Sequence, residues 1–211
     1  GRVVDALRES GRFENTFLVL LADHGELLLD HGFRGKEEYH YDACIRVPLI
    51  VRGPGLEQGK ERRELVQLED VFPTVLEMAG LSAPQPRVMG PYLQDSPELL
   101  PGRSLLALCG GRQPADWREA AYVESYNSIT SASPVHWART IRTVRHRYTM
   151  YPCGGGEQLF DLEQDPQEQR NLAGDPACAD LRRELRDRLM ELIILQDYPH
   201  TMRDCVAHGV H

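Results

Sequence analysis

The chain has 211 residues, a formal net charge of −8 and 41% hydrophobic residues. This length is enough for one sizeable core, or for one large and one small domain. The acidic balance, without a basic cluster, argues against a nucleic-acid partner, because phosphate binding requires concentrated lysine and arginine. No apolar stretch approaches the length of a transmembrane segment. The five cysteines include no C-x-x-C pair, so neither a zinc ribbon nor a disulfide framework is indicated.

The first half of the sequence alternates helical and extended patterns. Apolar residues in Val3–Leu7 mark one helical face, and the run Thr16–Ala22 is typical of a buried parallel strand. A second strand is expected at Val47–Val51. A helix is then expected to begin at Asp70, with Asp70 as its N-cap and Gly80 as a natural C′ stop.

From about residue 120 the pattern changes to short strands. An antiparallel group is expected at Ala121–Glu124, Trp137–Val144, Tyr148–Tyr151 and Gln158–Asp161. The last helix should begin at Asp175-Pro176, an N-cap followed by an N1 proline. Leucines at helical spacing within it (Leu181, Leu185, Leu189 and Leu192) predict that this helix packs onto the small sheet.

Polar residues directly follow the first predicted strand. Asp23 and His24 come immediately after it, and Lys36 lies on the next loop. Because open α/β sheets place their chemistry beyond the carboxyl ends of their strands, Asp23 and His24 lie where a metal is expected, and Lys36 is a candidate anion contact. The alternative is that Asp23 caps a turn, His24 is a solvated loop histidine and Lys36 lies on the surface. Position in the sequence does not decide between the two.

The segment from Thr16 to Gly55 resembles the sulfatase family, a branch of the alkaline-phosphatase-like hydrolases. Matching motifs occur in family order over roughly residues 1–195: Asp23-His24, Lys36, Arg46–Ile50, Pro54-Gly55, Asp70–Leu76 with Ala79-Gly80, Gly102–Leu105, Leu159–Leu162, Asp165-Pro166 and Asn171-Leu172. The resemblance implies an α/β fold: the C-terminal part of an alkaline-phosphatase-like mixed sheet with flanking helices, then a small antiparallel sheet covered by a C-terminal helix. Residues 1–115 would belong to the catalytic domain, 116–198 to a small α+β subdomain and 199–211 to a tail.

The resemblance also implies a metal-dependent hydrolase of sulfate esters, either small molecules or glycans. Asp23 and His24 would bind a divalent cation, and Lys36 would contact the sulfate group. His31 could reach the substrate from the same loop, or the sequence Asp30-His31-Gly32 could instead shape the turn that aims Lys36. Relatives with Asp-His at this place imply Ca²⁺, whereas an imidazole ligand taken alone favours Mn²⁺ or Zn²⁺.

The family's nucleophile is a cysteine (sometimes a serine) in Cys-x-Pro/Ala-x-Arg, where the cysteine is oxidised to formylglycine. None of the five cysteines matches this pattern; Cys178, for example, precedes Arg182 by four residues but has Asp180 where Pro or Ala is required. Since the match begins in mid-fold, we expect a fragment that is inactive alone, with the nucleophile and the other metal ligands in a missing N-terminal half. Two alternatives stay open: a phosphodiester or phosphonate monoester hydrolase of the same superfamily, and a non-catalytic binding fragment.

Overall fold

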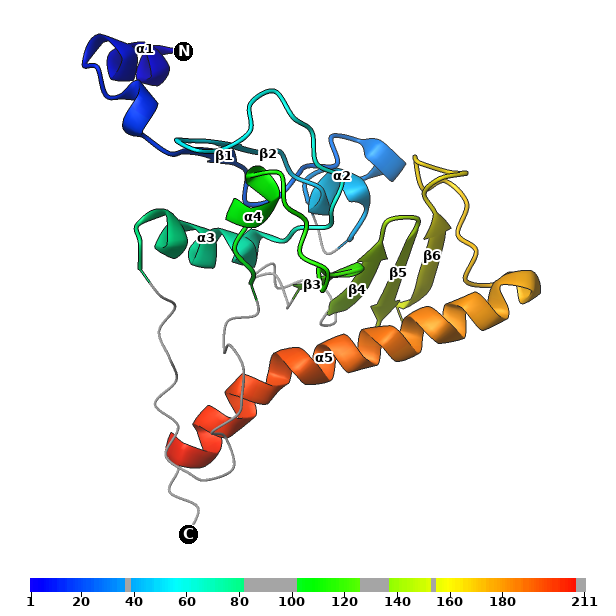
Figure 1. Ribbon diagram of the computed structural model, residues 1–211. Coiled ribbons are helices and arrows are strands. Elements are labelled where there is room, and N and C mark those ends of the chain that lie inside the picture. The colour runs from blue at the N-terminus through cyan, green and yellow to red at the C-terminus, as the bar shows by residue number, and fades with distance from the viewer. Residues whose placement is uncertain (37–38, 82–101, 126–136, 153–154, 208–211) are drawn as a thin grey trace. The chain divides into compact units, whose positions relative to one another are not determined.

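The computed structural model describes residues 1–36, 39–81, 102–125, 137–152 and 155–207, with side chains described up to residue 195 of the last helix (Figure 1). The chain forms two compact units, each described by itself below. The first contains Gly1–Asp23 and Val47–Trp117, and the second contains His24–Arg46 and Arg118–His211. The loop that carries His24 and Lys36 therefore packs with the C-terminal sheet, and the domain boundaries expected at residues 115 and 198 stay a prediction.

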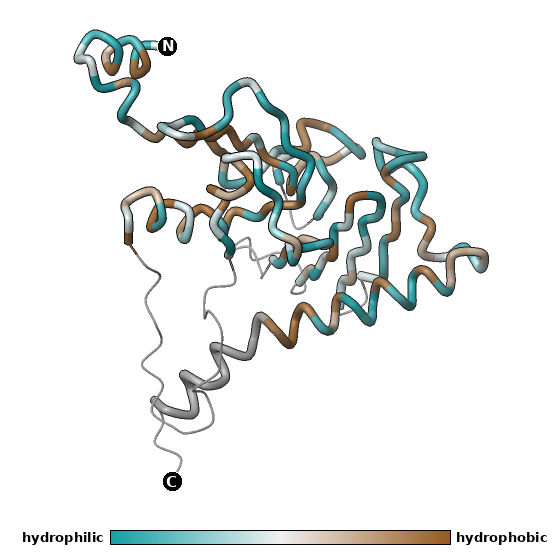
Figure 2. Tube along the Cα trace, in the orientation of Figure 1, coloured by the Kyte–Doolittle hydropathy of each residue, from teal (hydrophilic) through white to brown (hydrophobic). Residues whose placement is uncertain are grey.

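The first unit is built around a two-stranded ribbon. Its elements are α1 (Arg2–Glu9), the 3-10 turn η1 (Phe13–Asn15), β1 (Leu18–Leu21), β2 (Leu49–Arg52), η3 (Leu68–Asp70), α3 (Val71–Met78) and α4 (Leu106–Cys109). The strand expected at Thr16–Ala22 is confirmed as β1, but it pairs antiparallel with β2. The expected burial is also wrong at Leu20, which is 56% exposed, and Ile50 of β2 is 60% exposed as well. Apolar, brown stretches run through the region of β1 and β2 in Figure 2. A run of apolar residues indicates a strand but specifies neither its partner nor what covers its faces.

The helix expected at Asp70 is confirmed as α3, and Gly80 follows its end with a φ of +68°. The role predicted for Asp70 needs correction, because its side chain makes no N-cap hydrogen bond to α3. The carboxylate is fully buried and accepts hydrogen bonds from the main-chain N–H groups of Gln67 and Arg103, both at 2.7 Å. Asp70 thus attaches the loop at Gly102 to the start of α3; a Cβ at Gly102 would lie 2.0 Å from the carbonyl oxygen of Glu69.

The second unit contains the expected antiparallel sheet, in the order β3-β4-β5-β6. Its strands are β3 (Ala120–Ser125), β4 (Ala138–Thr143), β5 (His146–Tyr151) and β6 (Gly156–Asp161). The 3-10 turn η5 (Pro176–Cys178) begins with Asp175, whose side chain accepts a hydrogen bond from the N–H of Ala177, as predicted for the N-cap. The long helix α5 (Ala179–Ala207) follows directly, and it makes residues 199–207 of the expected tail helical.

The two faces of this sheet differ in chemistry. One face carries Ile141, Tyr148 and Leu159, which form an apolar core with Leu185 and Leu189 of α5. This packing confirms the predicted leucine stripe. The opposite face carries buried polar side chains from β4 and β5 (Thr140, Arg147 and Thr149). The segment Tyr39–Arg46, which includes the short helix α2 (Asp42–Ile45), packs against this polar face.

Candidate functional site

The sequence Asp23-His24-Gly25 leaves the end of β1 and leads to α2. Asp23 and His24 are both exposed. The main-chain N–H of Gly25 donates to the carbonyl of Cys44 at 2.7 Å, and that of Glu26 donates to the carbonyl of Ala43 at 3.1 Å. A Cβ at position 25 would lie 1.9 Å from the oxygen of Ala43, so only glycine fits this close approach. The glycine after His24 therefore fixes the chain against α2.

Residues 27–36 form a compact loop that returns to the same helix. The N–H of Leu27 donates to the carbonyl of Gly35 at 2.9 Å, and the N–H of Leu29 donates to that of Phe33 at 2.8 Å. The thiol of Cys44 in α2 donates to the carbonyl of Lys36 at 3.3 Å. Burial raises the pKa of this thiol, so it stays protonated and able to donate. Both ends of the loop are consequently attached to α2.

This attachment brings the His24 and Lys36 side chains together. The Nδ1 atom of His24 lies 2.8 Å from the carbonyl oxygen of Gly25, and its Nε2 atom lies 2.7 Å from the Nζ of Lys36. A carbonyl only accepts hydrogen bonds, so Nδ1 carries the proton and Nε2 keeps a lone pair that accepts from the lysine ammonium. A metal-binding histidine commonly donates its other ring N–H to a carbonyl in this way. The tautomer of His24 thus suits a metal ligand that binds through Nε2, and a cation there would take the place of the Lys36 hydrogen bond.

His31 lies within the loop at the 3-10 turn η2 (Asp30–Gly32), where its own φ is +50°. Its ring stacks on that of Tyr41, with centroids 3.7 Å apart and an angle of 11° between the planes. The side chain is 11% exposed, and the main-chain N–H of His31 donates to the carboxylate of Asp30. These contacts agree with a role in shaping the turn that carries Lys36. A contact between His31 and substrate stays a prediction.

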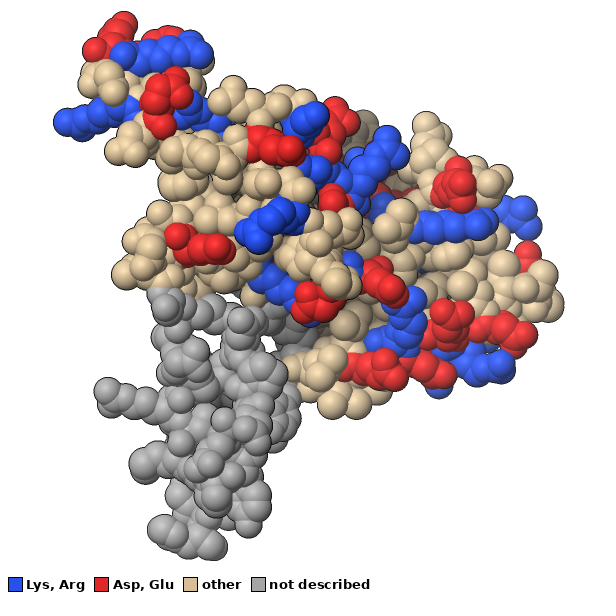
Figure 3. Space-filling view, in the orientation of Figure 1, with Lys and Arg blue, Asp and Glu red and all other residues tan. Residues whose placement is uncertain are grey.

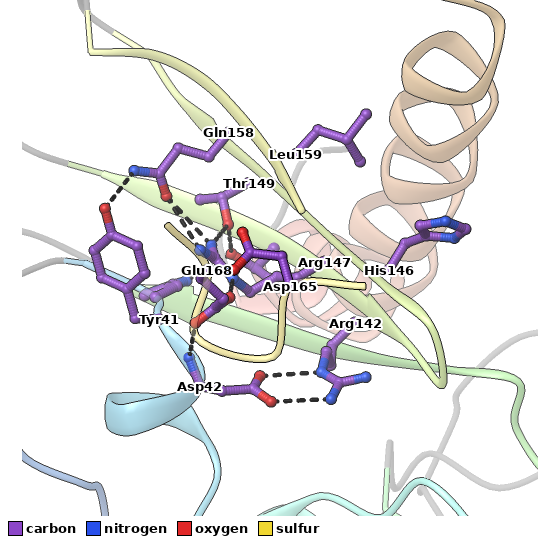
Figure 4. Close-up of polar contacts among 12 residues, drawn as sticks. Tyr41, Asp42, Arg142, His146, Arg147, Thr149, Gln158, Leu159, Asp165 and Glu168 are labelled. Carbon is purple, nitrogen blue, oxygen red and sulfur yellow. Dashed lines mark hydrogen bonds and ion pairs between the residues drawn. The ribbon is translucent and has the colours of Figure 1, made fainter. Parts of the chain in front are cut away.

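The structure adds an ionic network that joins α2 to the sheet (Figure 4). Arg147 of β5 is fully buried and forms an ion pair with Glu168, which is 3% exposed. The second carboxylate oxygen of Glu168 accepts the main-chain N–H of Asp42 at 2.7 Å. Asp42 in turn binds Arg142 through two hydrogen bonds of 3.0 and 2.9 Å. Sequence reasoning missed Glu168 and Arg147. The available signal was the place of Glu168 between the motifs Asp165-Pro166 and Asn171-Leu172.

His40 belongs to the same buried layer. It is 5% exposed, and its Nδ1 lies 2.8 Å from the hydroxyl of Thr140, which also bonds to the hydroxyl of Thr149 at 2.7 Å. Burial, with the charges of Arg147 and Arg139, lowers the pKa of His40 to about 3. The imidazole is therefore neutral at physiological pH, and it joins its own segment to the sheet through a hydrogen bond.

As metal ligands, Asp23 and His24 would provide one oxygen and one nitrogen donor. Among the residues that the structure describes, no three His, Cys, Asp or Glu side chains are grouped so as to hold a metal. Ca²⁺ takes six to eight oxygen ligands, so Asp23 and His24 would fill only part of its coordination shell. The pair fits the part of a metal site that the family resemblance assigns to it, and further ligands are needed.

Charged side chains of both signs are interspersed over the surface of the described residues in Figure 3. Many of them pair, for example Arg145 with Asp161 at 2.7 Å and Arg52 with Glu14 at 2.6 Å. None of the helices in the described residues is both long enough and apolar enough to cross a membrane.

The α/β architecture, with a four-stranded antiparallel sheet and a covering C-terminal helix, is that of the C-terminal part of a sulfatase. Residues 30–194 match the family model for N-sulphoglucosamine sulphohydrolase, C-terminal. The chain belongs to this family, within the sulfatases, which are sulfuric ester hydrolases of the alkaline-phosphatase-like type. The family and the fold predicted from the sequence motifs are thereby confirmed.

Individual relatives show the same relationship. The chain is 30% identical to a Delta 4,5-hexuronate-2-O-sulfatase of Bacteroides thetaiotaomicron, over 90% of this chain and 37% of that protein. The structure of a 2-O GAG sulfatase matches with a TM-score of 0.77 and 28% identity, over 98% of this chain and 41% of that one. A phosphonate monoester hydrolase from Silicibacter pomeroyi matches with a TM-score of 0.78 and 29% identity, over 95% and 39%. The chain thus spans about two-fifths of the length of these relatives.

Proposed function

We propose that this chain supplies the metal-binding and sulfate-contacting side of the active site of a sulfate ester hydrolase. Asp23 and His24 bind a divalent cation, and Lys36 contacts the sulfate group. The contact between the Nε2 of His24 and the Nζ of Lys36 at 2.7 Å carries this proposal. This contact supports the proposal because it brings an imidazole and a cationic side chain together on the loop that follows the first strand in a member of the sulfatase family.

The chemistry of a sulfate ester explains why these residue types are needed. Negative charge lies on the oxygens around sulfur and builds on the leaving oxygen as the ester bond breaks. The Lys36 ammonium neutralises part of that charge. The hydrogen bond from Nδ1 of His24 to the Gly25 carbonyl holds the proton on Nδ1, so that Nε2 can bind the cation once Lys36 moves from Nε2 to the sulfate oxygens. A bound divalent cation would polarise the sulfuryl oxygens and hold the nucleophile.

We propose Ca²⁺ as the cation, with Mn²⁺ and Zn²⁺ as alternatives because an imidazole ligand suits them better. The substrate class is a sulfate ester of a glycan or of a small molecule. Two of the sulfatase relatives are named for hexuronate and N-acetylglucosamine sulfate chemistry. The nucleophile, which we take to be a formylglycine, and the remaining metal ligands come from residues of the complete enzyme that this chain does not contain.

Phosphonate or phosphodiester hydrolysis is the second candidate. The specific observation in its favour is the structural match to a phosphonate monoester hydrolase, with a TM-score of 0.78 and 29% identity. Both ester classes present a tetrahedral anion, so a cation next to a lysine serves either of them.

The test is turnover of aryl sulfates and aryl phosphonates by the complete enzyme, before and after chelation and readdition of Ca²⁺, Mn²⁺ or Zn²⁺. We expect Lys36→Ala to lower kcat/KM for the sulfate about 100- to 1000-fold, the effect typical of losing one charge-stabilising group. The matched control is Lys60→Ala, at an exposed lysine of the other unit. Asp23→Ala should abolish the response to cation.

Three results would oppose the proposal. Turnover of phosphonates without sulfates would favour the second candidate. Full activity of Asp23→Ala would refute its role as a metal ligand. Turnover of neither ester, with no effect of any cation, would favour a non-catalytic binding protein.

A further inference from the structure

We propose that Glu168 is a positioning residue: from the C-terminal subdomain it holds α2, and through α2 it fixes the relative placement of His24 and Lys36. This inference rests on the proposed function for those two side chains. It extends that function by assigning a role in the site to a residue far along the chain that does not contact either of them.

The first step is the contact between Glu168 and α2. One carboxylate oxygen accepts the N–H of Asp42, the first residue of the helix, at 2.7 Å. The other oxygen pairs with Arg147, whose guanidinium is fully buried and also donates to the hydroxyl of Thr149 at 2.7 Å. Glu168 is therefore held on one side by the sheet and holds α2 on the other. The Glu168 side chain has little rotational freedom, because both of its oxygens are engaged and the residue is 3% exposed.

The second step runs from α2 to the site. The carbonyls of Ala43 and Cys44 accept the N–H groups of Glu26 and Gly25, and the Cys44 thiol donates to the carbonyl of Lys36. One helix of four residues thus fixes the main chain next to His24 and the main chain of Lys36 itself. A shift of α2 would change the distance between the two functional side chains, which is 2.7 Å here.

The backbone at Glu168 gives an independent reason to look for a specific role. Its φ is +55°, in the left-handed region where a residue with a Cβ is disfavoured and glycine fits without strain. A glutamate at such a position costs free energy relative to glycine. Its side chain provides what glycine lacks, namely the two contacts to Asp42 and Arg147. Strain of this kind persists where the surrounding contacts outweigh it, often near functional sites.

A general loss of stability is the competing explanation, since removing one partner of a buried ion pair destabilises a protein wherever it lies. Two variants separate the explanations. Glu168→Ala removes both contacts, whereas Glu168→Gln keeps an oxygen that can accept the N–H of Asp42 and loses the charge opposite Arg147. The matched control is Glu157→Gln, in the same unit. Glu157 accepts the hydroxyl of Tyr148 at 2.8 Å and lies 3.6 Å from Arg182 of α5, so it serves the α5 side of the sheet.

Amide hydrogen exchange of this chain, measured where every variant is folded, reports the attachment of Gly25 and Glu26 to α2. We expect exchange at these two amides to accelerate about tenfold or more in Glu168→Ala, to be largely restored in Glu168→Gln, and to be unchanged in Glu157→Gln. Equal acceleration in Glu157→Gln, or none in Glu168→Ala, would overturn the proposal.

Paramagnetic broadening of the His24 ring signals by Mn²⁺ adds a readout that general destabilisation does not predict. This method detects weak binding, which suits a chain that supplies only part of a metal site. We expect about tenfold weaker Mn²⁺ binding in Glu168→Ala and wild-type binding in Glu157→Gln. Unchanged binding in Glu168→Ala would refute the positioning role. If the wild-type chain shows no broadening while the exchange results are as expected, Asp23 and His24 do not bind Mn²⁺ without the remaining ligands, and the attachment of the loop by Glu168 stands.

Discussion

Replacement of His40 by glutamine should remove a pH-dependent component of stability. The wild-type imidazole is 5% exposed, and burial, with the charges of Arg147 and Arg139, lowers its pKa from the ordinary histidine value of 6.5 to about 3. Below pH 6.5 His40 therefore binds a proton in the unfolded chain but stays neutral in the folded protein. The free energy of unfolding falls as the pH falls, until the pH approaches the folded pKa.

The size of the effect follows from the two pKa values. Within this window, each unit by which the pH falls lowers the free energy of unfolding by up to about 1.4 kcal/mol. Between about pH 7 and about pH 5, the difference in proton uptake amounts to about 1.9 kcal/mol. Glutamine does not titrate and can still bond to the hydroxyl of Thr140, so His40→Gln should lack this component.

Urea denaturation at the two pH values measures the contribution of His40 to the free energy of unfolding. Subtracting the variant's pH dependence from that of the wild type removes the contributions of all other groups. His146→Gln is the control, because burial also lowers the pKa of His146 but the carboxylate of Asp161 opposes the shift, so a smaller difference is expected. An equal pH dependence in wild type and His40→Gln would refute the claim that His40 is buried in its neutral form.

Three further substitutions test the packing and the surface charge. Gly25→Ala should lower the free energy of unfolding, measured by urea denaturation, by about 3 kcal/mol, because its Cβ would meet the Ala43 carbonyl and break two hydrogen bonds. Gly174→Ala, in open space, should change that free energy by less than about 1 kcal/mol. Equal effects of the two substitutions would contradict the close approach at Gly25. Leu185→Ala in the fully packed core should cost about 2–5 kcal/mol in the same assay, and a cost below about 1 kcal/mol would contradict its burial. Arg145→Gln should raise the pKa of Asp161, which the hydrogen bond from Arg145 lowers to about 2, in an NMR titration; an unchanged pKa would show that other groups set it.

The elements with clear sequence periodicity were predicted correctly. The leucine spacing in α5 and the cap at Asp175 depend on residues within a few positions of each other, and the structure confirms both. The burial of the polar face of the sheet was not predicted. Polar residues in alternate positions of a strand, such as Arg147 and Thr149 of β5, normally indicate a solvent-exposed face. Here that face is covered by a segment about 100 residues earlier in the chain, which only a long-range contact could reveal.

The candidate site was predicted in part for the same reason. Asp23, His24 and Lys36 are close in the sequence and belong to a motif, so their type and order suggested their chemistry. The contact of His24 with Lys36 depends on how the loop is attached to α2, and this attachment leads on to Glu168. A role for Glu168 could not be derived from local spacing, because its partners lie on two other elements.

The hydrogen bond from Asp42 to Glu168 joins residues 126 positions apart, and this separation bears on the order in which the protein acquires its structure. The β4–β5 hairpin closes over a few residues, whereas closing a chain segment of this length loses far more conformational entropy before any contact repays it. During synthesis at the usual rate, about 6 to 25 s pass between the addition of Asp42 and that of Glu168. The loop with His24 and Lys36 leaves the ribosome before the C-terminal sheet, and it gains its final support only after that sheet has been made.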